Sequence, residues 1–159
     1  MRLLKREISY TEYLNTEIPA EYLPLIEEAK KQTLNAYAAY SKFNVGAAAL
    51  LANGKIIGGN NQENAAYPSG LCAERTAVFY ANSQYPDVPV KAIAIAAYAN
   101  GEYLQDPITP CGGCRQVLLE TESRYGKDVK MILYGTEKTY VMENVKQLLP
   151  LSFGKERLD

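Results

Sequence analysis

The stretch FNVGAAALLANGKIIGG, residues 43–59, contains two short apolar runs, 43–51 and 55–59. They are separated by Ala52-Asn53-Gly54. Asn-Gly between apolar runs is a strong hairpin signal, because both residues readily adopt the positive φ angles of a tight turn. The stretch therefore predicts an antiparallel strand pair.

The segments outward from this hairpin predict helices that alternate with strands. On its N-terminal side, apolar positions from Pro19 recur at near-helical spacing, which predicts a helix over about 19–38. On its C-terminal side, a polar loop over 60–71 leads to the next helix. The further predicted elements are helices over about 72–82, 110–122 and 143–149 and strands over 90–97, 129–134 and 139–142. This alternation is typical of an α/β sandwich with a mixed sheet.

Length and composition restrict the class of protein. The 159 residues fit one domain over 1–159, with residues 1–17 as a short strand or helix of unknown role. A net charge of -1 without a basic stripe disfavours a nucleic-acid polymer as partner. No run approaches the roughly 20 apolar residues of a membrane span. Three cysteines, an odd number, argue against a disulfide framework and favour a cytoplasmic protein.

The three cysteines lie in two motifs. Cys72 belongs to Cys-Ala-Glu-Arg, residues 72–75, and Cys111 and Cys114 belong to Pro-Cys-Gly-Gly-Cys-Arg, residues 110–115; the chain has no histidine. Each motif falls where a helix is expected to begin, and the positive end of the helix dipole favours a thiolate there. Three thiolates hold a tetrahedral zinc ion with one position open, as catalytic zinc sites do. The motifs therefore predict a catalytic zinc site.

Charged neighbours complete the predicted chemistry. Glu74 lies two residues after Cys72 and can carry a proton for water at the metal. Three thiolates outweigh the charge of Zn²⁺, so we expect a guanidinium from Arg75 or Arg115 to donate to a thiolate and compensate. Together these residues predict a zinc hydrolase.

Different interpretations of the same residues remain open at the level of sequence. Cys111 and Cys114 alone fit a redox dithiol, and the three cysteines with a carboxylate fit a structural zinc module. Arg75 and Arg115 could equally be surface charges. Four more residues have a structural interpretation: Asn61 and Glu63 could shape a turn, and Phe43 and Phe153 could be core aromatics.

The motifs taken together resemble those of the small cytidine deaminases. The resemblance rests on Cys-Ala-Glu-Arg-Thr-Ala at 72–77 and Pro-Cys-Gly-Gly-Cys-Arg-Gln at 110–116. It extends over about 37–154 and includes Tyr-Ser-Lys-Phe at 40–43, Val-Gly-Ala-Ala at 45–48, Asn-Gln-Glu-Asn-Ala at 61–65, Tyr-Pro-Ser-Gly at 67–70 and Leu-Pro-Leu-Ser-Phe-Gly at 149–154. It implies a three-layer α/β/α sandwich with a mixed sheet.

The resemblance also implies a reaction. Zinc held by the three cysteines would activate water for attack on C4 of cytosine, and Glu74 would carry protons to N3 and to the leaving amino group. Cytidine and deoxycytidine would become uridine and deoxyuridine with release of ammonia, in pyrimidine salvage. Arg75 would support the thiolates. The sequence leaves the preference between ribose and deoxyribose open.

Substrate contacts and assembly follow from the same resemblance. The Ala73 N–H would hold the base carbonyl, Phe43 would stack on the base, and Asn61 and Glu63 would bind the ribose 3′ hydroxyl. The family is usually a homotetramer in which residues matching Tyr67 and Phe153 reach a neighbour's site. A relative acting on another cytosine compound, such as the nucleoside antibiotic blasticidin S, is the alternative within the deaminases.

Overall fold

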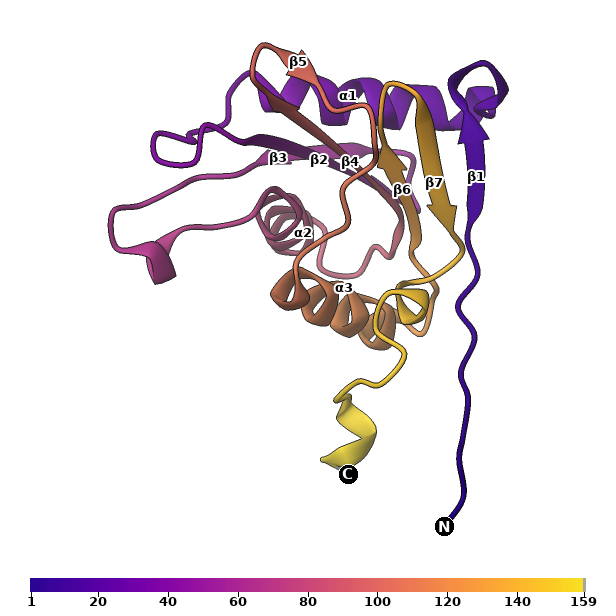
Figure 1. Ribbon diagram of the computed structural model, residues 1–159. Helices are drawn as coiled ribbons and strands as arrows, with labels where there is room; N and C mark the ends of the chain where they lie inside the picture. The colour runs from indigo at the N-terminus through magenta and orange to yellow at the C-terminus, as the bar shows by residue number, and fades with distance from the viewer. Residues whose placement is uncertain (159) are drawn as a thin grey trace.

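The computed structural model describes residues 1–158, and a seven-stranded sheet forms its centre (Figure 1). The strands are β1 (Thr11–Leu14), β2 (Asn44–Leu51), β3 (Ile56–Asn60), β4 (Val90–Ala99), β5 (Glu102–Tyr103), β6 (Lys130–Tyr134) and β7 (Lys138–Met142). The α-helices are α1 (Leu23–Thr33), α2 (Ala73–Gln84) and α3 (Gly112–Tyr125). The strand order is β1-β7-β6-β4-β2-β3, with β5 paired to β4 beside this path.

The sheet is mixed, as the sequence predicts. β4 and β6 pair in parallel, whereas the pairs β1–β7, β7–β6, β4–β2, β2–β3 and β4–β5 are antiparallel. β2 and β3 form the predicted hairpin, with Gly54 at φ 83° in the turn. The prediction of an α/β fold with a mixed sheet is confirmed.

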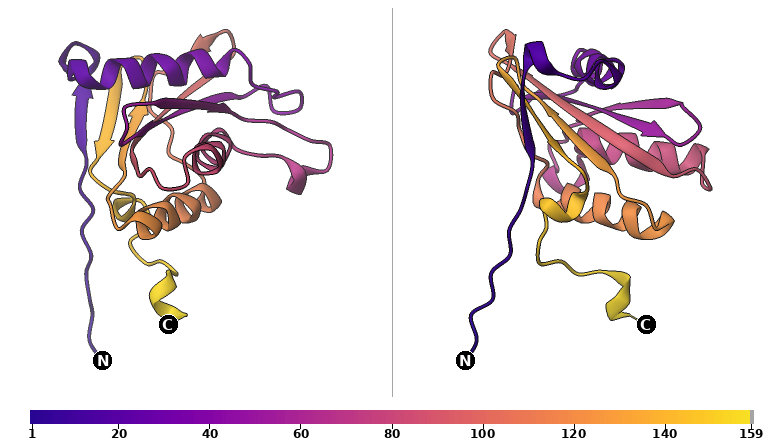
Figure 2. Two further views of the ribbon diagram at one scale, coloured as in Figure 1. Left: turned by 180° about the vertical axis from the view of Figure 1, so that it is seen from behind. Right: turned by 90° about the vertical axis from the view of Figure 1, so that its right-hand side faces the viewer.

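Helices cover both faces of the sheet, with α1 on one face and α2 and α3 on the other (Figures 1 and 2). Side chains of a strand alternate between faces, and β4 uses this alternation to fit different neighbours. Its alanines Ala92, Ala94 and Ala96 join the apolar cluster under α1, while Ile93 and Ile95 join the cluster under α2 and α3. The result is the expected three-layer arrangement.

Two predicted helices are shorter than the sequence suggested. The segment predicted over 19–38 is a 3-10 turn at Ala20–Tyr22 followed by α1, which ends at Thr33. It ends there because the chain turns back to the sheet, where the Tyr37 N–H donates to the Asn61 carbonyl at 2.9 Å. The segment predicted over 143–149 contains a 3-10 helix, η4 (Val145–Gln147). Within residues 1–158, no helix is both long and apolar enough to cross a membrane.

The N-terminal segment supplies an edge strand. β1 pairs with β7, and the Tyr10 ring lies 4.9 Å from the Tyr140 ring. Before β1 the chain runs off the body in extended form, toward the side where the C-terminus also lies (Figure 2). The Arg6 guanidinium donates to the Pro150 carbonyl and the Ser9 N–H to the Gln147 side chain. Of the strand and the helix considered for residues 1–17, the structure has the strand, followed by one turn of 3-10 helix at Asn15–Glu17.

Gly59 determines how closely α2 approaches the sheet. A Cβ at this position would lie 2.4 Å from the Ala77 nitrogen and 2.8 Å from the Ala73 carbonyl oxygen, both backbone atoms of α2. Only a residue without a side chain allows this contact. The first turn of α2, which follows Cys72, is thus held directly on β3.

We expect Gly59→Ala to lower the free energy of unfolding by roughly 1–3 kcal/mol, because helix backbone must move to make room. Gly58→Ala is the matched control. The three atoms nearest its Cβ all belong to the flexible side chain of Gln32, which can shift at the cost of its hydrogen bonds with Glu28 and Asn60, whereas helix backbone cannot. Chemical denaturation of both variants at one protein concentration measures the difference. An equal cost at the two positions would contradict the role of Gly59.

Candidate active site

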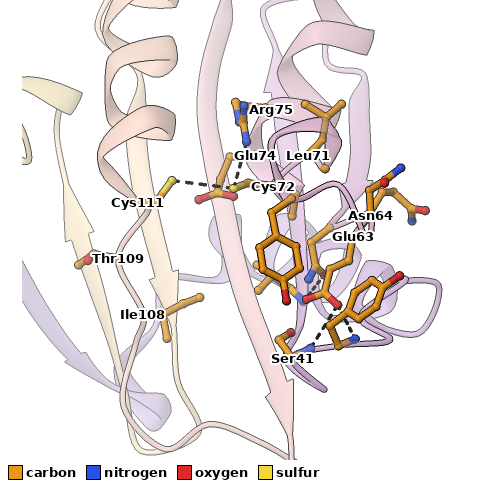
Figure 3. Close-up of a pocket in the computed structure, with 17 residues that line it drawn as sticks. Ser41, Glu63, Asn64, Leu71, Cys72, Glu74, Arg75, Ile108, Thr109 and Cys111 are labelled. Atoms are coloured by element: carbon orange, nitrogen blue, oxygen red, sulfur yellow. Dashed lines mark hydrogen bonds between the residues drawn. The ribbon is translucent and has the colours of Figure 1, made fainter.

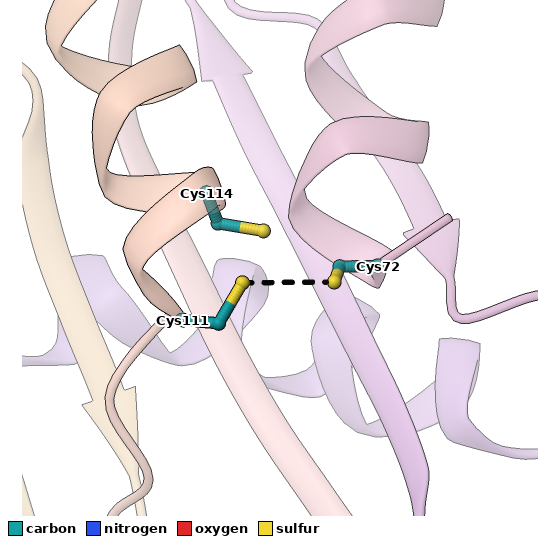
Figure 4. A group of neighbouring side chains, drawn as sticks. All are labelled: Cys72, Cys111 and Cys114. Carbon is teal, nitrogen blue, oxygen red and sulfur yellow. Dashed lines mark hydrogen bonds between the residues drawn. The ribbon is translucent and has the colours of Figure 1, made fainter. Parts of the chain in front are cut away.

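The starts of α2 and α3 bring the three cysteines together. Cys72 is the N-cap residue of α2, Cys111 is the N-cap residue of α3, and Cys114 lies in the first turn of α3. Their sulfur atoms all lie within 4.8 Å of one another, and the Cys72 and Cys111 sulfurs are 3.8 Å apart (Figure 4). Residues 39 positions apart in the sequence thus meet at one point.

The cluster has the dimensions of a zinc site. Tetrahedral zinc with Zn–S bonds of about 2.3 Å requires sulfurs about 3.8 Å apart, which the Cys72–Cys111 pair matches. Over residues 1–158, no carboxylate or further thiol joins the three sulfurs. The cluster therefore fits zinc with one coordination position left for another ligand, and lacks the carboxylate that a closed structural site would need.

Arg75 lies at the cluster, as predicted. Its Nη2 donates to the Cys72 sulfur at 3.5 Å (Figure 3). Hydrogen bonds from the Cys114 thiol and from Arg75 lower the pKa of Cys72 to about 5. The hydrogen bond to Cys72 and burial raise the pKa of Cys114. Negative charge is therefore concentrated on Cys72, next to the guanidinium.

Glu74 is buried beside the cysteines. The residue is only 5% exposed, lines the cleft, and places its carboxyl group beside the Cys72 and Cys111 sulfurs (Figure 3). Burial raises the pKa of Glu74, since an ionised carboxylate loses its hydration there. A raised pKa makes the Glu74 carboxylate a stronger base, which suits a group that takes up and returns a proton.

Arg115 does not contact a thiol. Its Nε donates to the Pro110 carbonyl at 2.8 Å, its Nη1 to the Leu148 carbonyl at 2.9 Å and its Nη2 to the Thr109 hydroxyl at 3.0 Å. The structure therefore places Arg115 neither at a sulfur nor free on the surface. Of the two arginines considered for charge compensation, Arg75 is the one at a thiol.

A cleft of about 580 Å³ opens beside the cluster. Among the predicted site residues, the following line it: Asn61, Glu63, Tyr67, Cys72, Ala73, Glu74, Arg75 and Cys111. Phe43 and Phe153 do not line it. Lining residues that the sequence did not assign are Tyr40, Ser41, Val45, Gln62, Asn64, Gly70, Leu71, Ile108 and Thr109. Six of these nine residues lie within motifs quoted above, and the other three, Leu71, Ile108 and Thr109, lie next to the cysteine motifs.

Asn61 and Glu63 organise their own loop. The Val45 N–H donates to the Asn61 Oδ1 at 2.8 Å, and the Asn61 Nδ2 donates to the Phe43 carbonyl at 2.9 Å. The Glu63 Oε2 accepts the Tyr40 N–H at 2.8 Å and the Ser41 N–H at 3.2 Å. Hydrogen bonds from Ser41 and Tyr40 lower the pKa of Glu63. Both residues therefore shape the loop, as one interpretation of the sequence held. Among the hydrogen bonds of the described residues, one Asn61 N–H and the Glu63 Oε1 are not used, so they can bond a ligand.

The site combines three clustered thiols, a buried carboxyl group and an open cleft on an α/β/α sandwich. This combination places the protein in the class of zinc-dependent hydrolases. Comparison with known proteins gives the family. Residues 20–127 match the family model for the cytidine and deoxycytidylate deaminase zinc-binding region. The chain belongs to this family, which confirms the resemblance inferred from its motifs and zinc as the cofactor.

Individual relatives agree with the family match. A cytidine deaminase of Halalkalibacterium halodurans is 39% identical over 135 residues, 85% of this chain and 96% of the relative. One of Sporosarcina psychrophila is 42% identical over 134 residues, 84% of this chain and 92% of the relative. The fold is similar to the crystal structure of cytidine deaminase from Burkholderia pseudomallei, with a TM-score of 0.71 at 38% identity, covering 83% of this chain and 98% of that one.

We expect Arg75→Ala to raise the pKa of Cys72 above its value of about 5, because the thiolate loses a charged donor. Thiolate absorbance against pH, recorded after removal of metal with a strong chelator, measures the shift. We also expect weaker zinc retention. Arg124→Ala, on α3 and bonded to the Pro86 carbonyl, is the control. A titration identical to that of the unmodified protein would contradict this role of Arg75.

Proposed function

We propose that this chain hydrolytically deaminates cytidine and deoxycytidine to uridine and deoxyuridine, releasing ammonia. The observation that carries the proposal is the buried Glu74 beside three clustered thiols at the end of an open cleft. Relatives that cover nearly the same length and carry the name cytidine deaminase support the substrate. Pyrimidine salvage is the corresponding biological role.

The cysteines and the start of α2 would arrange the reacting groups. Cys72, Cys111 and Cys114 would hold zinc, which when bound makes water a nucleophile at neutral pH. The Ala73 N–H lies in the first turn of α2, where backbone donors have no acceptor within the helix. Ala73 lines the cleft, so its N–H can donate to the base carbonyl. The base would then present C4 toward the cysteines.

Glu74 would move the protons. It takes one proton from water as the oxygen adds to C4 and gives it to N3. It then takes the remaining hydroxyl proton and gives it to the amino group, so that the C4–N bond breaks and ammonia leaves. Water is thereby consumed, the carbonyl of uridine forms, and Glu74 returns to its starting protonation state. The raised pKa of Glu74 suits both transfers.

The sugar end of the cleft favours a nucleoside. Glu63 and Asn61 each keep one group free to bond a sugar hydroxyl. The lowered pKa of Glu63 keeps its carboxylate an acceptor. Among the described residues that line the cleft, Arg75 is the one basic residue, and it donates to Cys72. The Glu63 carboxylate at the sugar end would repel a phosphate such as that of deoxycytidylate, which favours the uncharged nucleoside.

We further propose that the protein assembles as a homotetramer with sites shared between subunits. Tyr67 is 76% exposed and Phe153 is 60% exposed, and α2 presents Phe79 and Tyr80 to solvent. Large exposed aromatics beside a cleft favour burial against another copy of the chain. Phe153 lies outside the lining of its own cleft, which fits a contact with a neighbour's substrate.

Three free thiols fit a reducing compartment, so we propose the cytoplasm.

The central test is Glu74→Gln. We expect bound zinc to be retained and turnover to fall by roughly 10²–10⁴-fold, because the amide keeps the shape but cannot carry a proton. The absorbance change of cytidine on conversion to uridine measures turnover, and elemental analysis measures zinc. Glu120→Gln, on the exposed side of α3, is the matched control. Near-normal turnover with Glu74→Gln would refute the assigned role.

The shared site is tested by dilution and by Phe153→Ala. We expect activity per subunit to fall on dilution together with the oligomer, as followed by light scattering. We expect Phe153→Ala to raise KM about tenfold while the oligomer persists, since one buried aromatic contact contributes about 1–3 kcal/mol. Leu158→Ala is the control, because this exposed residue lies five positions beyond Phe153. A fully active monomer would contradict the shared site.

A further inference from the structure

One arginine outside the proposed chemistry joins two segments that are far apart in the sequence. Arg115 lies on α3, and its guanidinium bonds the Thr109 hydroxyl and the Pro110 carbonyl just before this helix. The same group bonds the Leu148 carbonyl, 33 residues further along the chain. A planar guanidinium presents donors on three nitrogens in fixed directions and so holds three separated acceptors in one geometry, whereas the three donors of an ammonium share one rotating nitrogen.

The first of these segments, residues 109–111, presents a cysteine and forms a wall of the cleft. Thr109 lines the cleft, and Cys111 follows the buried Pro110 directly. Cys111 is itself exposed, so packing around its side chain does little to fix it. The backbone at Pro110 therefore sets the direction from which the Cys111 sulfur approaches the cluster, and Arg115 fixes that backbone.

The second segment is the C-terminal tail, which we define as residues 148–154. Leu151 and Phe153 point to solvent, so apolar packing on the chain's own body does not hold them. The tail is instead tied to α3 through its backbone: Arg115 bonds the Leu148 carbonyl, and the Gln116 Nε2 donates to the Phe153 carbonyl at 2.9 Å. Just before the tail, the Glu122 Oε1 accepts the Val145 N–H at 2.7 Å. Leu148 itself is buried in the core, and beyond it side chains of α3 and Arg6, which donates to the Pro150 carbonyl, set the course of the tail.

We propose that Arg115 is a positioning residue that couples docking of the C-terminal tail to the geometry of residues 109–111. Because one rigid group serves both segments, displacement of the tail removes an acceptor and loosens the hold on Pro110 and Thr109. The coupling lies within one chain. If Phe153 enters a neighbour's site, Arg115 also links the cysteine cluster of one subunit to the cleft of the next, a consequence that rests on the proposed function.

Amide hydrogen exchange on the zinc-loaded, full-length protein tests this coupling without substrate, so its result does not depend on deaminase activity. We expect Arg115→Gln to speed exchange about fivefold to tenfold in peptides covering both 104–111, which loses two hydrogen bonds, and 145–153, which loses one. A peptide covering 90–97 in β4 should keep its rate. Arg124→Gln, on the same helix, is the control and should change neither segment. Faster exchange in only one of the two segments would overturn the proposal.

Two milder variants, Gln116→Ala and Arg115→Lys, test the coupling if Arg115→Gln disturbs folding. Gln116→Ala removes a bond to the tail and none to residues 109–111. We expect it to speed exchange in both segments, and to have no further effect on 104–111 when combined with Arg115→Gln. Faster exchange confined to the tail would overturn the coupling. Arg115→Lys keeps the charge but not the three bonds, so we expect it to behave like Arg115→Gln; full protection with lysine would also overturn the proposal.

Discussion

Three sulfur atoms within 4.8 Å of one another are the constraint on which the rest of the structure depends. Thiolates at such distances repel one another, so the surroundings must favour negative charge. Two helix N-termini point at the cluster, and Arg75 donates to Cys72, the thiol whose pKa is lowered. Burial, and after it the charge of Cys72, raise the pKa of Glu74. Negative charge is thus favoured on Cys72 and disfavoured on Glu74.

The sheet serves this constraint by fixing the two helices that carry the cysteines. Gly59 lets α2 lie against β3, while Leu118 and Leu119 of α3 pack in the same apolar cluster as Ile93 and Ile95 of β4. At the other end of α3, the Glu122 Oε1 accepts N–H groups from Val129 and Val145, although its Oε2 is buried without a partner. A buried acceptor without a hydrogen bond lowers the free energy of unfolding by about 1–3 kcal/mol. The Glu122 side chain therefore anchors α3 and at the same time reduces the stability of the fold.

Two residues that line the cleft, Asn61 and Glu63, shape the backbone and are also proposed to bind substrate. Asn61 and Glu63 bond backbone groups between Tyr40 and Val45, which holds the loop that borders the cleft. The groups left over on the same side chains are those that we propose bind the sugar. Structural and functional interpretations of such residues are therefore compatible, because a side chain that is already fixed by the backbone loses little entropy when it binds a ligand.

Short-range patterns in the sequence were sufficient to predict much of the structure of this protein. Asn53-Gly54 predicted the hairpin of β2 and β3, and the spacing of Cys111 and Cys114 at a helix start predicted that both sulfurs would face one point. Turn chemistry, strand alternation and helix position act over a few residues, so the sequence by itself determined the mixed α/β fold and the pairing of Cys111 with Cys114; that Cys72 joins them, 39 residues away from Cys111, followed from the number of ligands that zinc needs and from the resemblance. Only the tertiary structure decided that β1 borders β7, that α1 stops at Thr33, and that Arg115 reaches Leu148. Those outcomes depend on which distant segments packing brings together, and no local pattern encodes the partner of a long side chain or of an edge strand.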